Sequence, residues 1–565
     1  MALKFKRIDK CWQNASNHPD TDVDFLLEEN NWDDFGFSTT YFLHASSKLT
    51  GKEPECLGAL RIMRKNQTTD DKYLLDTIFG SNIFSCLPED FISLSMDVDL
   101  YMGLNRWLSN EVDRQEIIKS LRMILGTDSE FFDDSLYSDL CFSNSLLRDG
   151  SSLDNFALKK GKALLTGSEC IYDLRKEAIS VKYSHIENEV KLDFSCVKED
   201  APSIPNGILV FIGKNGSGKS TAIYKLAKMM YADPTQRFRM KEKVGELKPN
   251  NVGVSKMFLI SYSPFDNFVL PASFDKDYIK LLEKKEDVNS RFVFCGIRDL
   301  VKELEDIEIN CETDDANIEK ILEDRRAKTS LKDISVLADE FSIALCPIIN
   351  IGGERNEQWN RFVHQCSIKQ PSLYEDIKKI DECSSPEQLK RVFLSLSTGH
   401  KYFLHSFVRL LAYLDDNSLV LFDEPENHLH PPLLSFMISS MRELMYKYRS
   451  VMFIATHSPI VLQETFANNV FIVRRIEGVS TISHPNIETY GANISAITSE
   501  VFDLTTSITA YHDAIRHLYK KWSMGYKDNV DIMLADFENE LGHALTDQME
   551  TYLINLYAKD NDVEN

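Results

Sequence analysis

Residues 208–220 read ILVFIGKNGSGKS, and this stretch decides the fold of the chain around it. The first five residues form a continuous apolar run, which is typical of a strand buried on both faces of a mostly parallel sheet. The next eight, 213–220, fit the pattern G-x-x-x-x-G-K-[ST], a glycine-rich turn whose backbone N–H groups cradle phosphates. An amphipathic helix is expected from Ser220 onward. Strand, turn and helix in this order predict an α/β core.

This loop predicts a nucleotide site, because the dipole at a helix N-terminus favours phosphate. We expect Lys219 to reach the β- and γ-phosphates of ATP and the Ser220 hydroxyl to ligate Mg²⁺. An ordinary glycine-serine turn is the alternative, but the flanking strand and helix argue against it. The predicted ATP-binding residues of the loop are Gly213, Asn215, Gly216, Ser217, Gly218, Lys219, Ser220 and Thr221.

Two further apolar runs, Leu419–Phe422 and Val451–Ile454, have the character of buried strands, and a helical pattern lies between them. Strand, helix and strand indicate a right-handed crossover in the same sheet. Two carboxylates follow the first of these runs. Ligands bind at the carboxyl ends of strands in open α/β sheets, so we expect Asp423 to lie near Mg²⁺. Glu424 is predicted to polarise the attacking water as a general base.

The rest of the chain is predicted to contain an N-terminal α+β region, a helical insertion and a C-terminal helical region. Thr39–Ala45 and Leu57–Met63 suggest a β-hairpin, and apolar residues recur at helical intervals between Asp99 and Leu125. The expected divisions are 1–175 for the N-terminal region, 176–277 and 390–475 for the two parts of the ATPase domain, 278–389 for the insertion, and 476–565 for the C-terminal region.

Composition excludes several classes of protein. The 565 residues include 64 Lys+Arg and 87 Asp+Glu, a net charge of −23, which disfavours broad binding to a phosphate backbone. No apolar run approaches the length needed to cross a bilayer, so we expect a cytoplasmic protein without a membrane partner. The 11 cysteines include no C-x-x-C pair, which favours reduced thiols over disulfides or a zinc site.

Later motifs resemble those of the ATP-binding-cassette class of ATPases. Leu396–Lys401, LSTGHK, looks like the signature motif of that class, and Ala455–Pro459, ATHSP, looks like its switch-histidine motif. The resemblance implies that Ser397 and Gly399 contact the ATP of a facing copy, so that two chains sandwich two nucleotides in a homodimer or an assembly of dimers. It also implies that His457 contacts the γ-phosphate.

One position departs from this class. The predicted strand Met257–Ile260 leads into SYSPFDN, where the class has a glutamine that contacts metal and water, and no glutamine is present. Ser263 and Asp266 are the two candidates to replace it. His428 and His430 raise the alternative of a metal pair, but the surrounding DEPENHLHP is typical of one branch of these ATPases.

That branch includes ATPases of bacterial anti-phage and overcoming-lysogenization-defect systems, with DNA-repair and chromosome-organising ATPases as more distant relatives. The sequence looks closest to the ATPase subunit of Septu-type or retron-linked defence operons, which is paired with a separate HNH nuclease. This resemblance implies a regulatory ATPase whose nucleotide state controls a partner nuclease, with DNA or retron nucleic acid reached through the complex. The alternative is an ATPase that itself binds or processes DNA, although only about 90 residues follow the cassette.

Overall fold

The computed structural model of the chain falls into two units, Met1–Ala492 and Asn493–Asn565, and each is described by itself. The described residues are 3–8, 22–29, 36–71, 75, 83–147, 153, 156–168, 173–194, 205, 207–232, 237, 240–248, 252–272, 278, 282, 288, 290–305, 322–326, 328–502, 510–522 and 529–562.

A seven-stranded sheet forms the centre of the first unit, in the order β12-β11-β13-β14-β9-β15-β16. Every neighbouring pair is parallel except β15 with β16, which is antiparallel. The predicted α/β core with a mixed, mainly parallel sheet is therefore confirmed. The strands are β9 (Ile208–Ile212), β11 (Met257–Ser261), β12 (Phe292–Gly296), β13 (Leu419–Asp423), β14 (Val451–Thr456), β15 (Val470–Ile476) and β16 (Val479–Ser483).

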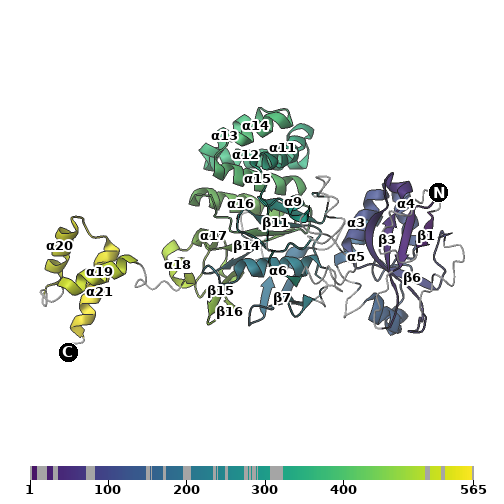
Figure 1. The fold of residues 1–565 in the computed structure, drawn as a ribbon, viewed down its shortest axis with the longest axis horizontal. Helices are drawn as coiled ribbons and strands as arrows, with labels where there is room; N and C mark the ends of the chain where they lie inside the picture. Colours follow the sequence, from purple (N-terminus) through teal and green to yellow (C-terminus); the bar gives the residue numbers. More distant parts are fainter. Residues whose placement is uncertain are drawn as a thin grey trace. The chain divides into compact units, whose positions relative to one another are not determined.

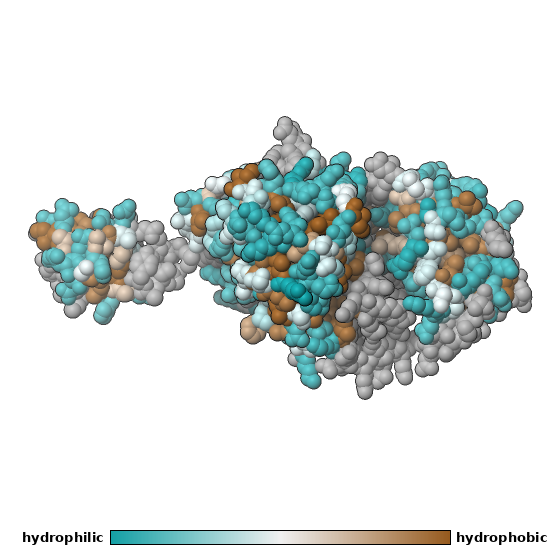
Figure 2. Space-filling model, turned by 90° about the horizontal axis from the view of Figure 1, so that it is seen from above, coloured by the Kyte–Doolittle hydropathy of each residue, from teal (hydrophilic) through white to brown (hydrophobic). Residues whose placement is uncertain are grey.

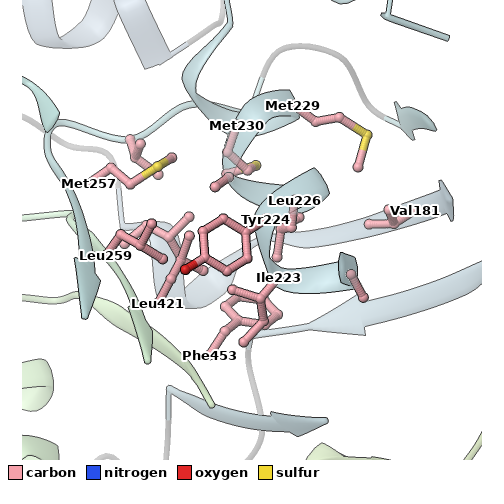
Figure 3. Close-up of a cluster of buried hydrophobic side chains, with 14 of the residues drawn as sticks. Val181, Ile223, Tyr224, Leu226, Met229, Met230, Met257, Leu259, Leu421 and Phe453 are labelled. Atoms are coloured by element: carbon pink, nitrogen blue, oxygen red, sulfur yellow. The ribbon is translucent and has the colours of Figure 1, made fainter. Parts of the chain in front are cut away.

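Helices cover both faces of this sheet: α6 (Lys219–Tyr231) lies on one face, and α15 (Thr398–Tyr413) and α16 (Pro431–Lys447) lie on the other (Figure 1). Figure 3 shows the cluster beneath α6, where Tyr224 and Leu226 lie among strand residues such as Leu421. Each large apolar side chain buried in this way contributes about 1.5–3 kcal/mol, so the cluster holds α6 firmly at the end of β9.

A small antiparallel sheet, with the order β10-β7-β8, contributes to the same hydrophobic core. Its strands are β7 (Ala178–Tyr183), β8 (Val190–Asp193) and β10 (Gly245–Lys248). The turn between β7 and β8, residues 184–189, approaches the phosphate loop, since His185 Nε2 lies 3.3 Å from the Gly218 carbonyl oxygen.

The N-terminal region has a six-stranded sheet and a hydrophobic core of its own, so the predicted α+β character is confirmed. The sheet order is β5-β1-β2-β3-β4-β6, and the predicted hairpin is present because β3 and β4 pair antiparallel. The elements are β1 (Phe5–Ile8), β2 (Phe25–Glu29), β3 (Thr40–Ala45), α1 (Ser47–Thr50), β4 (Glu55–Arg64), β5 (Ile83–Phe84), β6 (Phe91–Leu94), α3 (Val98–Trp107), α4 (Glu111–Ser120) and α5 (Phe156–Thr166).

The helical insertion is also present, but it begins later than the expected boundary at residue 278. β12 lies inside the segment 278–389 and pairs with β11, so this part of the segment belongs to the central sheet. Similarly, β16 lies beyond residue 476, where only helices were expected. The helices of the insertion are α9 (Leu300–Glu305), α11 (Ile334–Ile351), α12 (Glu354–Lys369), α13 (Pro371–Asp381) and α14 (Pro386–Ser395).

The second unit consists of helices in its described part, as expected for the C-terminal region. Its buried residues, among them Tyr519, Phe537 and Leu553, form a separate hydrophobic cluster. The helices of the second unit are α18 (Ile494–Phe502), α19 (Ala510–Trp522), α20 (Val530–Leu541) and α21 (Asp547–Asp562). One more short helix, α17 (Pro459–Gln463), belongs to the first unit and lies between β14 and β15 in the sequence.

Contrary to the expectation that no apolar run approaches the length needed to cross a bilayer, one described helix, α11, is long and apolar enough by length and composition, with a mean hydropathy of 1.6. This is weak evidence, because core helices pass the same test, and α11 packs against α14 and α15. On the face shown in Figure 2, hydrophilic residues cover most of the coloured surface and apolar residues form smaller patches.

Candidate nucleotide-binding site

The phosphate loop joins the end of β9 to the start of α6, as the sequence predicts. Two of its glycines have left-handed backbone angles, with φ of 77° at Gly216 and 108° at Gly218, where a side chain would be strained. A Cβ atom at Gly213 would lie 2.2 Å from the Val473 carbonyl oxygen. The glycines therefore permit a tight turn packed against β15, the kind of turn whose backbone N–H groups cradle phosphate.

Lys219, the invariant cation of this type of loop motif, is 5% exposed. Its Nζ donates hydrogen bonds to the carbonyl oxygens of Gly213, at 2.9 Å, and Lys214, at 3.2 Å. Burial lowers the pKa of Lys219, while the nearby carboxylates, with Glu424 the strongest, oppose that effect. Phosphate oxygens form stronger, charge-assisted bonds than these carbonyls, so the ammonium group is poised for an anionic ligand.

Ser220 and Asp423 meet across the site, with the serine Oγ donating to Asp423 Oδ1 at 2.9 Å. Burial, followed by the charge of Asp266, raises the pKa of Asp423 to about 8. A buried carboxylate beside a hydroxyl fits the donor set of Mg²⁺, which prefers one or two protein oxygens together with phosphates and water. Within the described residues no cluster of three or more His, Cys, Asp or Glu side chains forms a metal site by itself. Magnesium here would neutralise phosphate charge.

Glu424 follows Asp423 with a φ of 50°, a left-handed conformation that is unusual for a residue with a side chain. Its backbone N–H donates to the Ala455 carbonyl oxygen at 2.8 Å, and Asn427 Nδ2 donates to its Oε2 at 3.1 Å. Such strain costs about 1–3 kcal/mol and persists where surrounding contacts hold it in place. In this conformation Glu424 lines a cavity that opens beside the phosphate loop.

His457 lies at the end of β14, beside Glu426 and outside the cavity wall. Its side chain is 43% exposed, and its Nδ1 is 3.0 Å from Glu426 Oε1. The same carboxylate oxygen accepts hydrogen bonds from the His457 N–H at 2.7 Å and from Thr456 Oγ1 at 2.8 Å. Glu426 therefore orients the end of β14 together with the predicted switch histidine.

A cavity of about 750 Å³ opens above the phosphate loop, a size usual for sites that bind small molecules. The hairpin of β15 and β16 forms one wall, and it is tied to the phosphate loop because Ser480 Oγ of β16 donates to the Ser217 carbonyl oxygen at 3.0 Å. The residues that line the cavity come from the segments 184–187, 215–221 and 478–480, together with Arg475, Phe268, Arg325 and Glu424.

The signature residues lie outside this cavity wall. Ser397 is exposed and caps α15, accepting a hydrogen bond from the His400 N–H at 3.3 Å. Gly399 lies in the first turn, where a Cβ atom would be 2.9 Å from the His428 carbonyl oxygen. The structure therefore brings phosphate-loop residues 215–221 and Glu424 to the lining of one cavity, with Asp423 behind it through its hydrogen bond to Ser220, and it places Ser397, Gly399 and His457 away from the lining.

The remaining motif residues have identifiable structural contacts. His430 caps α16, because its Nδ1 accepts a hydrogen bond from the Leu433 N–H at 3.3 Å. Asp266 is buried and accepts hydrogen bonds from the Tyr224 hydroxyl and from the Phe268 N–H. Sequence reasoning did not find Phe268 or Arg325, because neither belongs to a motif and they meet only through a contact distant in sequence.

Residues 301–463 match a family described as "AAA domain, putative AbiEii toxin, Type IV TA system". The matched stretch begins after the phosphate loop and spans the signature motif, Asp423, Glu424 and His457. With the phosphate-loop geometry, this match indicates an ATP-binding protein with an ATPase domain.

The chain is also similar to "Protein ea59" of Escherichia phage lambda, with 25% identity over 525 residues, 92% of each protein. Two solved structures show weaker likeness. One is "Crystal structure of the SmcHead bound to the C-winged helix domain of ScpA", with 12% identity and a TM-score of 0.23 over 55% of this chain and 96% of that chain. The other is "An inward-facing conformation of a putative metal-chelate type ABC transporter", with 14% identity and a TM-score of 0.22 over 55% and 98%.

Proposed function

We propose that the protein is a nucleotide-dependent switch in which two copies associate around bound ATP and separate after hydrolysis. The observation that carries this proposal is the division of the site. Phosphate-binding residues are assembled in one cavity, whereas Ser397, which is exposed, and Gly399, which is half-buried, lie at the start of α15 and do not line it. A facing copy would bring its own α15 to the open side of the cavity.

The exposed end of α15 has the chemistry needed for this contact. Helix N-termini carry backbone N–H groups and a positive dipole that favour phosphate oxygens. If the γ-phosphate is held between two chains, the free energy of ATP binding also favours association of those chains. Loss of that phosphate removes the contact, so one chemical step changes the oligomeric state.

Hydrolysis in this proposal depends on the chain's own acidic residues. Glu424, held by Asn427, accepts a proton from the attacking water, and Asp423 with Ser220 holds Mg²⁺. Lys219 moves from the loop carbonyls to the phosphates. His457, oriented by Glu426, contacts the γ-phosphate once the site closes.

The wider role we propose is regulation of a separate HNH-type nuclease in an anti-phage defence complex of the cytoplasm. The support is the resemblance to defence ATPases, together with a family description that names a toxin of a toxin–antitoxin system. A net charge of −23 agrees with a subunit that reaches nucleic acid through a partner.

The test uses the full chain with Glu424→Gln, which should hold ATP in the associated state. Light scattering should show monomers without nucleotide and dimers, or assemblies of dimers, with Mg·ATP. Copurification from the native operon should recover a nuclease whose activity depends on the nucleotide. An unchanged mass with ATP would contradict the switch, and metal-dependent DNA cleavage by the chain alone would instead support a DNA-processing enzyme.

A further inference from the structure

Arg325 reaches the nucleotide cavity from a segment outside the ATPase motifs. Its guanidinium carbon lies 4.4 Å from the centre of the Phe268 ring, and its Nη1 donates to Asn267 Oδ1 at 3.0 Å. Phe268 in turn stacks on Tyr224, with ring centres 4.2 Å apart. Tyr224 is one turn along α6 from Thr221, so this stack places a cation beside the N-terminus of the helix.

Backbone contacts fix the segment 322–326 in this position. Arg325 forms an antiparallel bridge with Phe268. The bridge is flanked by hydrogen bonds from Val269 N to Asp324 O, at 3.1 Å, and from Arg326 N to Asn267 O, at 2.7 Å. Lys228 of α6 also donates to the Glu323 carbonyl oxygen at 2.6 Å. Arg325 is therefore an exposed side chain on an anchored backbone.

Arg326 adds a second anchor through a buried ion-pair cluster. Its Nη1 lies 3.5 Å from Glu303 Oε2, and Glu303 pairs with Arg298 at 2.7 Å. Glu303 is 4% exposed, so this ion-pair cluster is buried. Neighbouring arginines thus have different environments, because Arg326 faces this cluster and Arg325 faces the cavity.

The charged residues that line the cavity indicate what Arg325 contributes to ligand binding. The lining holds two carboxylates, Glu187 and Glu424, and three cations, Lys219, Arg325 and Arg475. Without Arg325, the lining would have no excess of positive charge to attract a polyphosphate. A guanidinium stacked on a ring keeps its edge N–H groups available, and these groups pair well with phosphate oxygens.

We propose that Arg325 binds the phosphate chain of the nucleotide held by the phosphate loop of the same chain. This inference rests on the nucleotide site described above, and it does not require association of two copies. It assigns a phosphate-binding residue to the segment after β12, in addition to the residues of the ATPase motifs. The Phe268 ring packs against the guanidinium of Arg325, and the backbone of residues 322–326 fixes the position of that arginine.

The test compares full-length Arg325→Ala with the unchanged chain by calorimetry, using Mg·ATP, Mg·GTP and inorganic tripolyphosphate. Loss of a charge-assisted pair should weaken the binding of all three on the order of tenfold, because they share the phosphate chain. Arg325→Lys, which keeps a point charge, should give an intermediate loss. Arg361→Ala removes an exposed arginine of α12 that does not line the cavity, and it should change nothing.

Unchanged affinity of Arg325→Ala would overturn the inference, and so would a loss seen with ATP but not with tripolyphosphate. Trypsin provides a test without substitution, since bound tripolyphosphate should slow cleavage after Arg325 but not after Arg361; equal cleavage would also overturn it. Lys219→Ala separates the two proposals. If Lys219→Ala binds ATP normally, the assignment of the nucleotide site itself is wrong. If Lys219→Ala fails to bind ATP while Arg325→Ala binds it normally, only the proposed role of Arg325 is refuted.

Discussion

The two ends of the proposed ATP site differ in how completely one chain builds them. At the phosphate end, Lys219 and Asp423 are buried, and both have hydrogen-bond partners from their own chain. At the signature end, Ser397 is exposed, and its side chain accepts a hydrogen bond from the first turn of its own helix. Nucleotide binding should therefore be a property of the single chain, while association should depend on the signature end.

Burial explains why these two ends should respond differently to substitution. A buried charged group that loses its partner costs several kcal/mol, whereas an exposed polar side chain contributes little within one chain. Changes at the phosphate end should thus affect both binding and chemistry. Changes at the signature end should leave binding by the single chain intact and affect assembly.

The largest effect is expected from Lys219→Ala. The variant should lose measurable ATP binding, because each charge-assisted hydrogen bond to a phosphate contributes about 1.5–3 kcal/mol and the ammonium group makes more than one. Fluorescent nucleotide titration measures this directly. Lys214→Ala, an exposed lysine in the same loop, should bind nearly as well as the unchanged chain. Normal affinity of Lys219→Ala would contradict the assignment of the phosphate end.

The next effect concerns the chemical step. Glu424→Gln should bind ATP but hydrolyse it about 10²–10⁴-fold more slowly, since the amide cannot accept the proton of the attacking water. Phosphate release under single-turnover conditions separates this step from binding. Glu382→Gln, which changes an exposed carboxylate after α13, serves as the control. Rapid hydrolysis by Glu424→Gln would remove Glu424 from the role of base.

The strands and helices around the phosphate end were predictable because their signals are local. Continuous apolar runs marked β9, β13 and β14, and the glycine pattern marked the loop between β9 and α6. The short strand β12 was missed, because four apolar residues and a glycine inside a mostly helical segment do not reveal their pairing with β11. Contacts distant in sequence, not local preference, decide such a strand.

The same reasoning applies to the site. Gly213, Lys219, Ser220, Asp423 and Glu424 come from recognisable motifs, and the structure brings them to one cavity or its base. Arg325 has no motif, because its position depends on a bridge to Phe268 across 57 residues of chain. The residue that replaces the missing glutamine also stays open, since Asp266 is already engaged by Tyr224.

A change at the signature end should separate assembly from binding. Ser397→Arg places a large cation where two copies would meet, so ATP-dependent association should be lost while the single chain binds ATP with unchanged affinity. Analytical ultracentrifugation with Mg·ATP measures the association, in a Glu424→Gln background to prevent turnover. Ser395→Arg, two residues earlier on exposed α14, is the matched control for added charge. An undisturbed dimer of Ser397→Arg would place the interface elsewhere.

The smallest effect tests whether Ser397 acts only as a helix cap. Ser397→Ala and Ser385→Ala remove equivalent caps, from α15 and α14 respectively, and each should cost about 1 kcal/mol. Amide hydrogen exchange should rise in the first turn of the helix concerned, since the loss is local. Association with ATP should weaken only for Ser397→Ala, because Ser385 lacks the proposed contact with a facing nucleotide. Equal association of the two variants would reduce Ser397 to a cap, and the comparison between the two ends of the site would then rest on Gly399 and the backbone of α15.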